Sequence, residues 1–352
     1  MQNSYLRTSI VLLSCFLITS TAALAQGFNL EGRKKRTTIP FQLVRNMIVI
    51  KLKINDRGPY NFILDTGVGM MVITEPSMVD SLIAPSYRKL NLYGLGDGQS
   101  LEAYVAPSIK VDVKGVKNKG MAAAILAKDH FGLSNYAGMD IHGLLGYQFF
   151  HDLSVKINFL DSALVVTKPK DMRKMSGSQQ IPITIENFRP YIYSDLELPD
   201  GTKKNSKLLV DIGAGHSLLL ENNEAPVKRY ISKANLGMGF NGPISGFMSR
   251  IGKMQLGKYK FGDVITSFPD KDSIKTNIVR TSRDGNLGMG ILKRFNILIN
   301  YQAGVMMLKP SAKFKDPFEH DMSGIEYYAG GKDYKRIIIN RIETKGNNAC
   351  IL

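Results

Sequence analysis

The chain has 352 residues, too many for one small hydrophobic core, so its length favours two or three domains. Its hydrophobic share of 44% and charged share of 22% are ordinary for a folded, soluble protein. The formal net charge is +16, but the lysines and arginines are scattered and no recognised nucleic-acid-binding motif appears. We therefore expect no nucleic-acid partner, although a basic protein would be drawn to anionic surfaces or acidic substrates.

Residues 1–25 have the pattern of a signal peptide. Arg7 supplies the positive start, residues 10–18 are mostly apolar, and Ala23-Leu24-Ala25 forms a small-x-small cleavage site. The apolar run is shorter than the ~20 residues that a membrane span needs, so we expect no transmembrane segment after cleavage. The sequence thus predicts an exported protein that is periplasmic, envelope-associated or secreted.

The two cysteines bear on this prediction. Cys15 follows Leu-Leu-Ser and faintly resembles a lipoprotein acylation site, but the apolar run continues past it, which argues against a lipid anchor. Cleavage after Ala25 would leave only Cys350, so no intramolecular disulfide is expected in the mature chain. Residues 26–37 would follow the cleavage site, and their basic run at 33–36 indicates a solvated N-terminal tail.

The most informative feature is a sequence motif that occurs twice. In each copy, one aspartate and a glycine turn lie between two apolar segments. The first copy is Phe-Ile-Leu-Asp-Thr-Gly-Val-Gly at residues 62–69, with Asp65 as its carboxylate. The second is Leu-Leu-Val-Asp-Ile-Gly-Ala-Gly at residues 208–215, with Asp211. A charge between apolar segments is costly unless something uses it. Two such carboxylates, one from each half, can meet at one site and share a proton.

The repeat extends well beyond these motifs. An Ile-Pro dipeptide, at 39–40 and again at 181–182, opens each half, and a β-rich segment and a polar turn lead from it to the aspartate. Downstream, the Gly-x-Leu-Gly segments at 143–146 and 285–288 lie the same distance before Ile-Asn-Phe and Ile-Asn-Tyr. Elements in the same order at nearly fixed spacing predict two related lobes. The predicted division is lobe 1 at 38–169, a polar linker at 170–180, lobe 2 at 181–310 and a tail at 311–352.

Secondary structure follows from the same pattern. Short β-branched and aromatic runs bounded by Gly, Pro, Asn and Asp predict an all-β chain with many hairpins. The segments 76–83 and 147–152 are the better helix candidates, and both would be short.

On these residues the chain resembles the bacterial aspartyl-protease-like proteins, which are single-chain, bilobal aspartic peptidases, over about residues 38–310. In that family each lobe supplies an Asp-Thr/Ser-Gly motif, and two hydrophobic residues and a glycine lie beneath it. The resemblance implies the acid-protease fold, with two β-barrel-like lobes, a cleft between them and few short helices. Asp65-Thr66-Gly67 matches fully, whereas Asn286 is polar where the second supporting motif has a hydrophobic residue. The residues implied to support the two loops are Thr66, Gly67, Ile212, Gly213, Leu144, Leu145, Gly146, Leu287 and Gly288.

The resemblance further implies an exported aspartic endopeptidase in which Asp65 and Asp211 form a catalytic dyad. Two like charges ~3 Å apart cannot both ionise, so the pair would hold one proton and titrate as a unit. The ionised member would act as general base on a water that attacks the scissile carbonyl, and the protonated member would donate to the carbonyl oxygen. Gly67 and Gly213 would let backbone amides approach the carboxylates. This chemistry needs a polypeptide substrate, no cofactor and no metal.

A site of this kind also needs a flap, a hairpin that closes over the substrate and excludes water. The glycine-rich segment 91–98 stands at that place in the first lobe, and the segment 237–242 stands at the like place in the second. Both are equally compatible with plain surface hairpins. The candidate flap residues are Tyr93, Gly94, Gly96, Gly237 and Gly239.

The second motif departs from the family at Ile212, where a hydroxyl is expected. In the family these hydroxyls bond across the lobes and hold the two loops together, so here only Thr66 could do so. A lost hydrogen bond costs only ~1 kcal/mol on average, which alone would not abolish catalysis. The alternatives are a catalytically silent peptide-binding protein of the same fold in the cell envelope, or a structural envelope protein.

Other features carry less chemistry. The five histidines show no metal-site spacing such as His-Glu-x-x-His, and His216 beside the second motif is expected to have a packing role. Relatives often carry a C-terminal PDZ-type domain, and residues 334–342 resemble its opening strand. Because a whole domain needs far more chain, we interpret the tail as the start of a truncated PDZ-like domain or as an unrelated strand. We expect a monomer.

Overall fold

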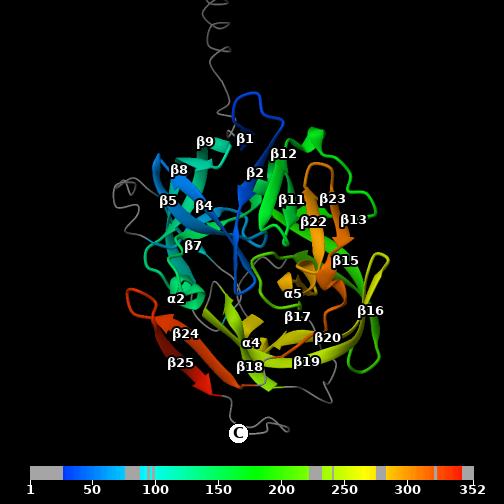
Figure 1. Cartoon of the computed structure of the whole chain (residues 1–352). Helices are drawn as coiled ribbons and strands as arrows, with labels where there is room; N and C mark the ends of the chain where they lie inside the picture. The colour runs from blue at the N-terminus through cyan, green and yellow to red at the C-terminus, as the bar shows by residue number, and fades with distance from the viewer. Residues whose placement is uncertain are drawn as a thin grey trace, which may run out of the picture.

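The structure is a computed structural model of the chain, and Figure 1 shows its arrangement. It describes residues 27–75, 88–92, 96, 100–221, 232–239, 242–274, 283–320 and 323–342. Several predictions lie outside the described residues: the signal peptide with Cys15, the helix at 76–83, the flap residues Tyr93 and Gly94, and Cys350.

The first lobe is built on a nine-stranded sheet, at the left of Figure 1. Its path runs β1-β9-β6-β10-β5-β4-β8-β7, and β3 pairs with β4. The expected helix after Gly146 is confirmed as α3. The bounds are β1 (Asn29–Leu30), β3 (Gln42–Val44), β4 (Met47–Ile54), β5 (Arg57–Leu64), β6 (Met71–Ile73), β7 (Arg88–Leu92), β8 (Leu101–Val113), β9 (Val116–Leu126), α2 (Leu133–Ala137), β10 (Gly143–Leu145) and α3 (Tyr147–His151).

The second lobe repeats this plan in an eight-stranded sheet with the order β14-β15-β16-β21-β17-β20-β19-β18. Its β16 and β21 run parallel, as β5 and β10 do in the first lobe. The bounds are β14 (Thr184–Glu186), β15 (Arg189–Glu197), β16 (Lys203–Val210), β17 (Leu218–Leu220), β18 (Ser232–Gly239), β19 (Gly242–Leu256), β20 (Tyr259–Pro269), α4 (Lys271–Ile274), β21 (Gly285–Leu287) and α5 (Met289–Leu292).

A third sheet of six strands joins the two halves, with the order β13-β23-β22-β11-β12-β2. The seam is an antiparallel ladder between β11 of the first half and β22 of the second, with Val155 opposite Ile299. The two lobes are therefore not separate barrels but share hydrogen-bonded backbone. The bounds are β2 (Arg36–Pro40), β11 (Ser154–Asn158), β12 (Ala163–Thr167), η2 (Pro169–Asp171), β13 (Gln179–Pro182), β22 (Phe295–Asn300) and β23 (Val305–Pro310).

The strand sequences explain why these elements form. In β4 the side chains of Ile50, Leu52 and Ile54 are buried while Lys51 and Lys53 point to solvent, which is the period-two pattern of a half-buried strand. The strands that carry the two aspartates end in apolar triplets that are buried on both faces. Buried side chains from both lobes and from the shared sheet form one continuous hydrophobic core, so the two halves fold against each other.

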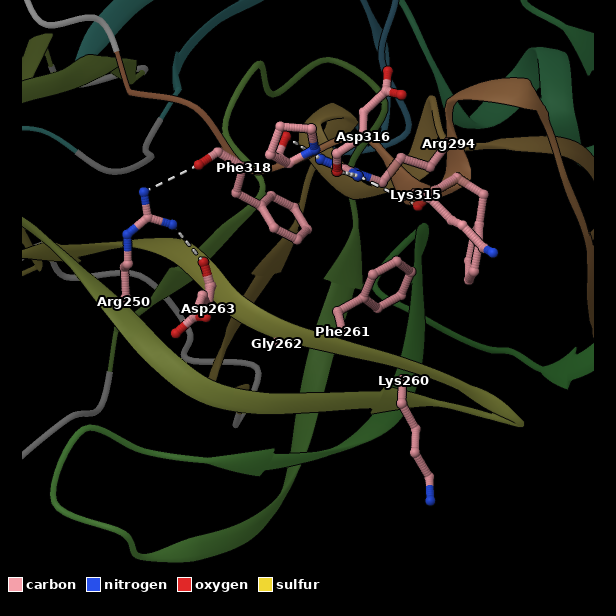
Figure 2. A pocket seen from close by; sticks show the side chains of 11 residues that line it. Arg250, Lys260, Phe261, Gly262, Asp263, Arg294, Lys315, Asp316 and Phe318 are labelled. Atoms are coloured by element: carbon pink, nitrogen blue, oxygen red, sulfur yellow. Dashed lines mark hydrogen bonds between the residues drawn. The ribbon is translucent and has the colours of Figure 1, made fainter.

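Residues 311–320 are held on the second lobe by two arginines, as Figure 2 shows. Arg250 donates from Nη1 to the carbonyl of Asp263 at 2.7 Å and from Nη2 to that of Phe318 at 3.1 Å. Arg294 donates to the carbonyl of Pro317 at 3.1 Å, and its guanidinium lies 3.9 Å from the centre of the Phe318 ring. Arg250, Arg294 and Phe318 line a pocket on this lobe. None of the predicted site residues lines the pocket, so it is separate from the paired aspartates. The short helix η3 (Ala312–Lys315) lies in this segment.

The last described strands, β24 (Ile325–Gly330) and β25 (Arg336–Ile342), form a hairpin that lies beside α2 (Figure 1). Asn135 of α2 donates to the carbonyl of Ala329 at 2.8 Å, and Tyr334 donates to Asp140 at 2.6 Å. The predicted tail strand thus exists, and its kinship with a PDZ domain stays a prediction. Within the described ranges, no helix is long and apolar enough to cross a bilayer.

Candidate active site

The two aspartates stand at equivalent places, each directly after the central strand of its lobe. Asp65 follows β5, and its N–H donates to the carbonyl of Leu145 in β10 at 3.0 Å. Asp211 follows β16, and its N–H donates to the carbonyl of Leu287 in β21 at 2.9 Å. Two of the leucines that the sequence placed beneath the motifs, Leu145 and Leu287, therefore anchor the aspartate loops by backbone hydrogen bonds.

The supporting glycines are required by close approach of the backbone. A Cβ on Gly146 would lie 2.3 Å from the carbonyl oxygen of Val68 and 2.4 Å from that of Asp65. A Cβ on Gly288 would lie 2.3 Å from the carbonyl oxygen of His216. Because real Cβ contacts are never this short, any side chain at these positions would push the aspartate loop away from its supporting strand.

The carboxyl groups of Asp65 and Asp211 lie close together between the lobes, because a Cβ on Gly67 would lie 3.0 Å from Asp65 Oδ1 and 3.1 Å from Asp211 Oδ2, and each carboxyl group acts on the pKa of the other. Each also accepts from its own loop: Gly67 N–H donates to Asp65 Oδ1 at 2.7 Å, and Gly213 N–H donates to Asp211 Oδ1 at 3.0 Å. A Cβ on Gly213 would lie only 2.4 Å from Cγ of Asp65, so the loop of one lobe packs directly on the carboxyl of the other. The structure thus brings together all the residues that the sequence placed at the aspartate loops.

Thr66 holds the two loops together from one side. Its hydroxyl donates to the carbonyl of Val210 at 2.6 Å and accepts from the N–H of Ile212 at 3.1 Å. Both bonds cross between the lobes, and both are buried. Ile212 has no hydroxyl to return and is instead fully buried in the hydrophobic core. The pair of cross-lobe hydrogen bonds made by Thr66 is therefore complete. The equivalent pair from position 212 is replaced by apolar packing of Ile212.

The surroundings raise the pKa of both carboxyl groups. Burial raises the pKa of Asp65 well above its usual range, and the nearby charge of Asp211 raises it further. Burial also raises the pKa of Asp211, against the opposing effects of the Gly213 N–H and the Arg283 charge. Such a pair retains a proton at a pH where isolated carboxyl groups have lost theirs.

Three polar residues at the site were not predicted from the sequence. Asn286 donates from Nδ2 to Asp211 Oδ2 at 3.3 Å. Arg283 forms a largely buried ion pair with Glu221 at 2.7 Å and acts on Asp211 by its charge. Arg189 reaches from the second lobe to donate to the carbonyl of Gly67 at 2.6 Å, and its charge lowers the pKa of Asp65. A comparison of the two halves of the repeat could have identified two of them, because Asn286 and Arg283 occupy positions that are apolar in the first half.

The predicted flap segments lie in hairpins at the outer edges of the two lobe sheets. Gly96 lies between β7 and β8, and its N–H donates to the carbonyl of Ser273 in the second lobe at 3.0 Å. Gly237 and Gly239 lie in β18 next to its turn into β19, and Gly237 has φ +126 with no atom within 4 Å of a Cβ. The first hairpin therefore spans from one lobe to the other, while a flap role for either hairpin stays a prediction.

His216 next to the second motif is an unsatisfied buried base. Its Nε2 is buried and has no hydrogen-bond partner among the described residues, and burial lowers its pKa to about 4. Among those residues, no cluster of three His, Cys, Asp or Glu could hold a metal ion. His216 therefore packs as a neutral ring beneath the site.

This burial predicts a loss of stability in acid. Since the folded-state pKa lies below the unfolded value, the neutral ring contributes fully above about pH 6.5, and its contribution falls as the pH drops towards 4. The shift corresponds to at most about 3 kcal/mol. We expect His216→Gln to reduce the difference in unfolding free energy between pH 7 and pH 4, measured by urea denaturation. The matched control is His130→Gln at an exposed position, and an equal effect of both substitutions would contradict the argument.

Comparisons with known proteins agree with this geometry. The family model described as "Aspartyl protease" matches residues 50–149, which include Asp65 and its supporting strand. Among solved structures, the aspartic proteinase from Irpex lacteus aligns with a TM-score of 0.53 at 11% identity, covering 81% of this chain and 100% of that one. None of the curated proteins matches the chain. Residues 50–149 are thus similar to the aspartyl protease family, and the chain has the acid-protease fold.

Proposed function

We propose that this protein is an exported aspartic endopeptidase that hydrolyses peptide bonds with Asp65 and Asp211. The observation that carries the proposal is the close approach of the two carboxyl groups, one from each lobe, on loops that Thr66 joins. A pair that shares one proton offers a general base and a general acid within reach of the same carbonyl group. The export part of the proposal rests on the pattern of residues 1–25 alone.

The proton transfers balance within the pair. The ionised carboxylate takes a proton from water while the oxygen of that water bonds to the scissile carbon, and the protonated carboxyl donates to the carbonyl oxygen. The resulting tetrahedral diol collapses when the C–N bond breaks. The first carboxyl then protonates the leaving nitrogen, and the second regains its proton from a diol hydroxyl. No covalent enzyme intermediate forms, and the dyad returns to its starting state.

The pKa directions also support a working pH above the strongly acidic range. The raised pKa values keep the shared proton on the pair at a pH where isolated carboxyl groups have lost theirs. The buried, neutral His216 beneath the second loop lowers the stability of the fold in acid. We therefore expect activity that is highest at mildly acidic to neutral pH.

The direct test incubates the purified mature chain with an unfolded protein substrate between pH 4 and pH 8, with half the samples in ¹⁸O-water. We expect new peptide ends, identified by mass spectrometry, whose carboxyl groups carry one ¹⁸O atom, and we expect pepstatin to suppress them. A folded protein that produces no new ends at any pH would refute the proposal. If that protein still bound peptides in the cleft, the silent peptide-binding alternative would replace it.

A further inference from the structure

The two lobes differ at the positions that face the aspartates from below. Asn286 lies opposite Leu209 in the parallel pair of β21 and β16, and Leu144 lies opposite Ile63 in the matching pair of β10 and β5. The second lobe thus places an amide where the first lobe places a leucine. Arg283 likewise lies two residues before Gly285, where the first half has Ile141 before Gly143.

The donors around the two carboxyl groups are accordingly unequal. Asp211 accepts hydrogen bonds from the backbone of Gly213 and Ala214 and from Nδ2 of Asn286. Among the described residues, Asp65 accepts a hydrogen bond from the backbone N–H of Gly67. Hydrogen bonds from neutral donors favour the ionised form of a carboxyl group, so the arrangement favours the negative charge on Asp211.

Burial of the Asn286 side chain is unfavourable for folding unless its amide forms hydrogen bonds. Its side chain is buried, with a relative exposure of 6%, and its Oδ1 has no hydrogen-bond partner among the described residues. A buried polar atom without a partner destabilises the folded state. Leu144 shows that the fold accepts an apolar residue in the same strand position. The amide Nδ2 is used there, because it donates a hydrogen bond to Asp211 Oδ2 at 3.3 Å.

Other charged groups face the pair and act on it unequally. The Arg283–Glu221 ion pair lies on the Asp211 side, with side-chain exposures of 17% and 10%, and the arginine charge favours an ionised Asp211. On the Asp65 side, Arg189 donates to the Gly67 carbonyl and favours an ionised Asp65, although burial and the neighbouring carboxyl have larger effects on that group. Tyr301 faces both carboxyl groups, and His216 lies on the Asp211 loop, but burial keeps both side chains neutral.

We propose that Asn286 is a positioning residue that, together with Arg283, holds the negative charge of the pair on Asp211 and leaves the shared proton on Asp65. The catalytic roles that follow from this inference rest on the proposed peptidase function. Asp211 would take the proton from the attacking water, and Asp65 would donate to the carbonyl oxygen. The near-symmetric lobes would then have fixed, different roles because one strand position differs between them.

The test titrates each carboxyl group separately, by ¹³C NMR of protein labelled at aspartate Cγ. In Asp65→Asn protein we expect Asp211 to titrate at lower pH than Asp65 does in Asp211→Asn protein. Adding Asn286→Leu to the first background should raise the pKa of Asp211 by about one unit, because an isolated donor to a carboxylate is lost. Adding the mirror substitution Leu144→Asn to the second background should lower the pKa of Asp65. If the leucine variant does not fold, Asn286→Ala removes the same donor.

The outcomes separate this inference from the proposed peptidase activity. An unchanged Asp211 titration in the Asn286 variants, or an Asp65 that titrates below Asp211, would overturn the inference even if the protein cleaves peptides. The expected titrations in a protein that cleaves nothing would keep the inference and refute the peptidase. In an active enzyme, Asn286→Leu should also move the acidic limb of the kcat/KM profile to higher pH. A uniform fall of activity without that movement would indicate a merely structural role and contradict the inference.

Discussion

Asp65→Asn and Asp211→Asn should each reduce peptide cleavage by about 10²–10⁴-fold, because each removes one partner of the acid–base pair. Asparagine has nearly the shape of aspartate and can accept the same hydrogen bond from Gly67 or Gly213, so the loops should keep their geometry. The measurement is kcat/KM on one peptide substrate, with Asp161→Asn at an exposed turn as the control. Equal activity of the two dyad variants and the control would refute the acid–base assignment.

The same variants should gain stability while they lose activity. The pKa of Asp65 is raised in the folded state, so this carboxyl favours folding fully only below its unfolded pKa, and the benefit is lost as the pH rises through the folded value. At neutral pH the charged pair therefore opposes folding. Asp65→Asn should have a higher melting temperature than the wild type at pH 7 and a smaller advantage at pH 4. A variant that is inactive because it is unfolded would show the opposite and would not support the proposed role.

Gly213→Ala should be nearly as damaging as loss of an aspartate, although it removes no functional group. The added Cβ would lie 2.4 Å from Cγ of Asp65 and 2.6 Å from its Oδ2, well inside contact distance. The Asp65 side chain is short and is held by the Gly67 N–H at 2.7 Å, so the carboxyl must move away from its partner. A misplacement of about 1 Å at a reacting group can cost about 10²-fold in rate. We expect at least that loss in kcat/KM.

Gly215→Ala is the matched control for this substitution. It lies in the same loop, and its Cβ would meet nothing closer than the carbonyl oxygen of Arg45 at 3.5 Å, which is ordinary contact. We expect this variant to keep most of the activity and to melt close to the wild-type temperature. Similar losses in the two alanine variants would mean that the loop tolerates no side chain at either glycine, and the specific contact with Asp65 would not explain the effect.

The fold and the place of the site could be predicted from the sequence because the signal is repeated. The motif around Asp65 and the motif around Asp211 each combine a buried strand end with a glycine turn, and the Gly-x-Leu-Gly segments recur at matching distances. The prediction of an all-β chain with the acid-protease fold is confirmed. The structure places the two aspartates side by side, while their catalytic roles stay predictions.

What the sequence did not predict depends on contacts between distant segments. The ladder between β11 and β22 joins residues more than a hundred positions apart, and alternating hydrophobicity specifies a strand but not its partner. In the sequence, Asn286 is only a poor match to a hydrophobic motif. Its interaction with the carboxyl group of Asp211 depends on the pairing of two strands, which the sequence does not specify. Arg189 could not be recognised because its partner, the Gly67 carbonyl, belongs to the opposite lobe.

The six-stranded sheet between the lobes limits how far the two lobes can move apart. A separation of the lobes would break the β11–β22 ladder, in which Val155 lies opposite Ile299. The outermost strands, β7 and β18, each lie at the edge of a lobe sheet, away from this ladder. In the proposed peptidase, a substrate would therefore approach the paired carboxyl groups beside these outer strands and not through a separation of the lobes.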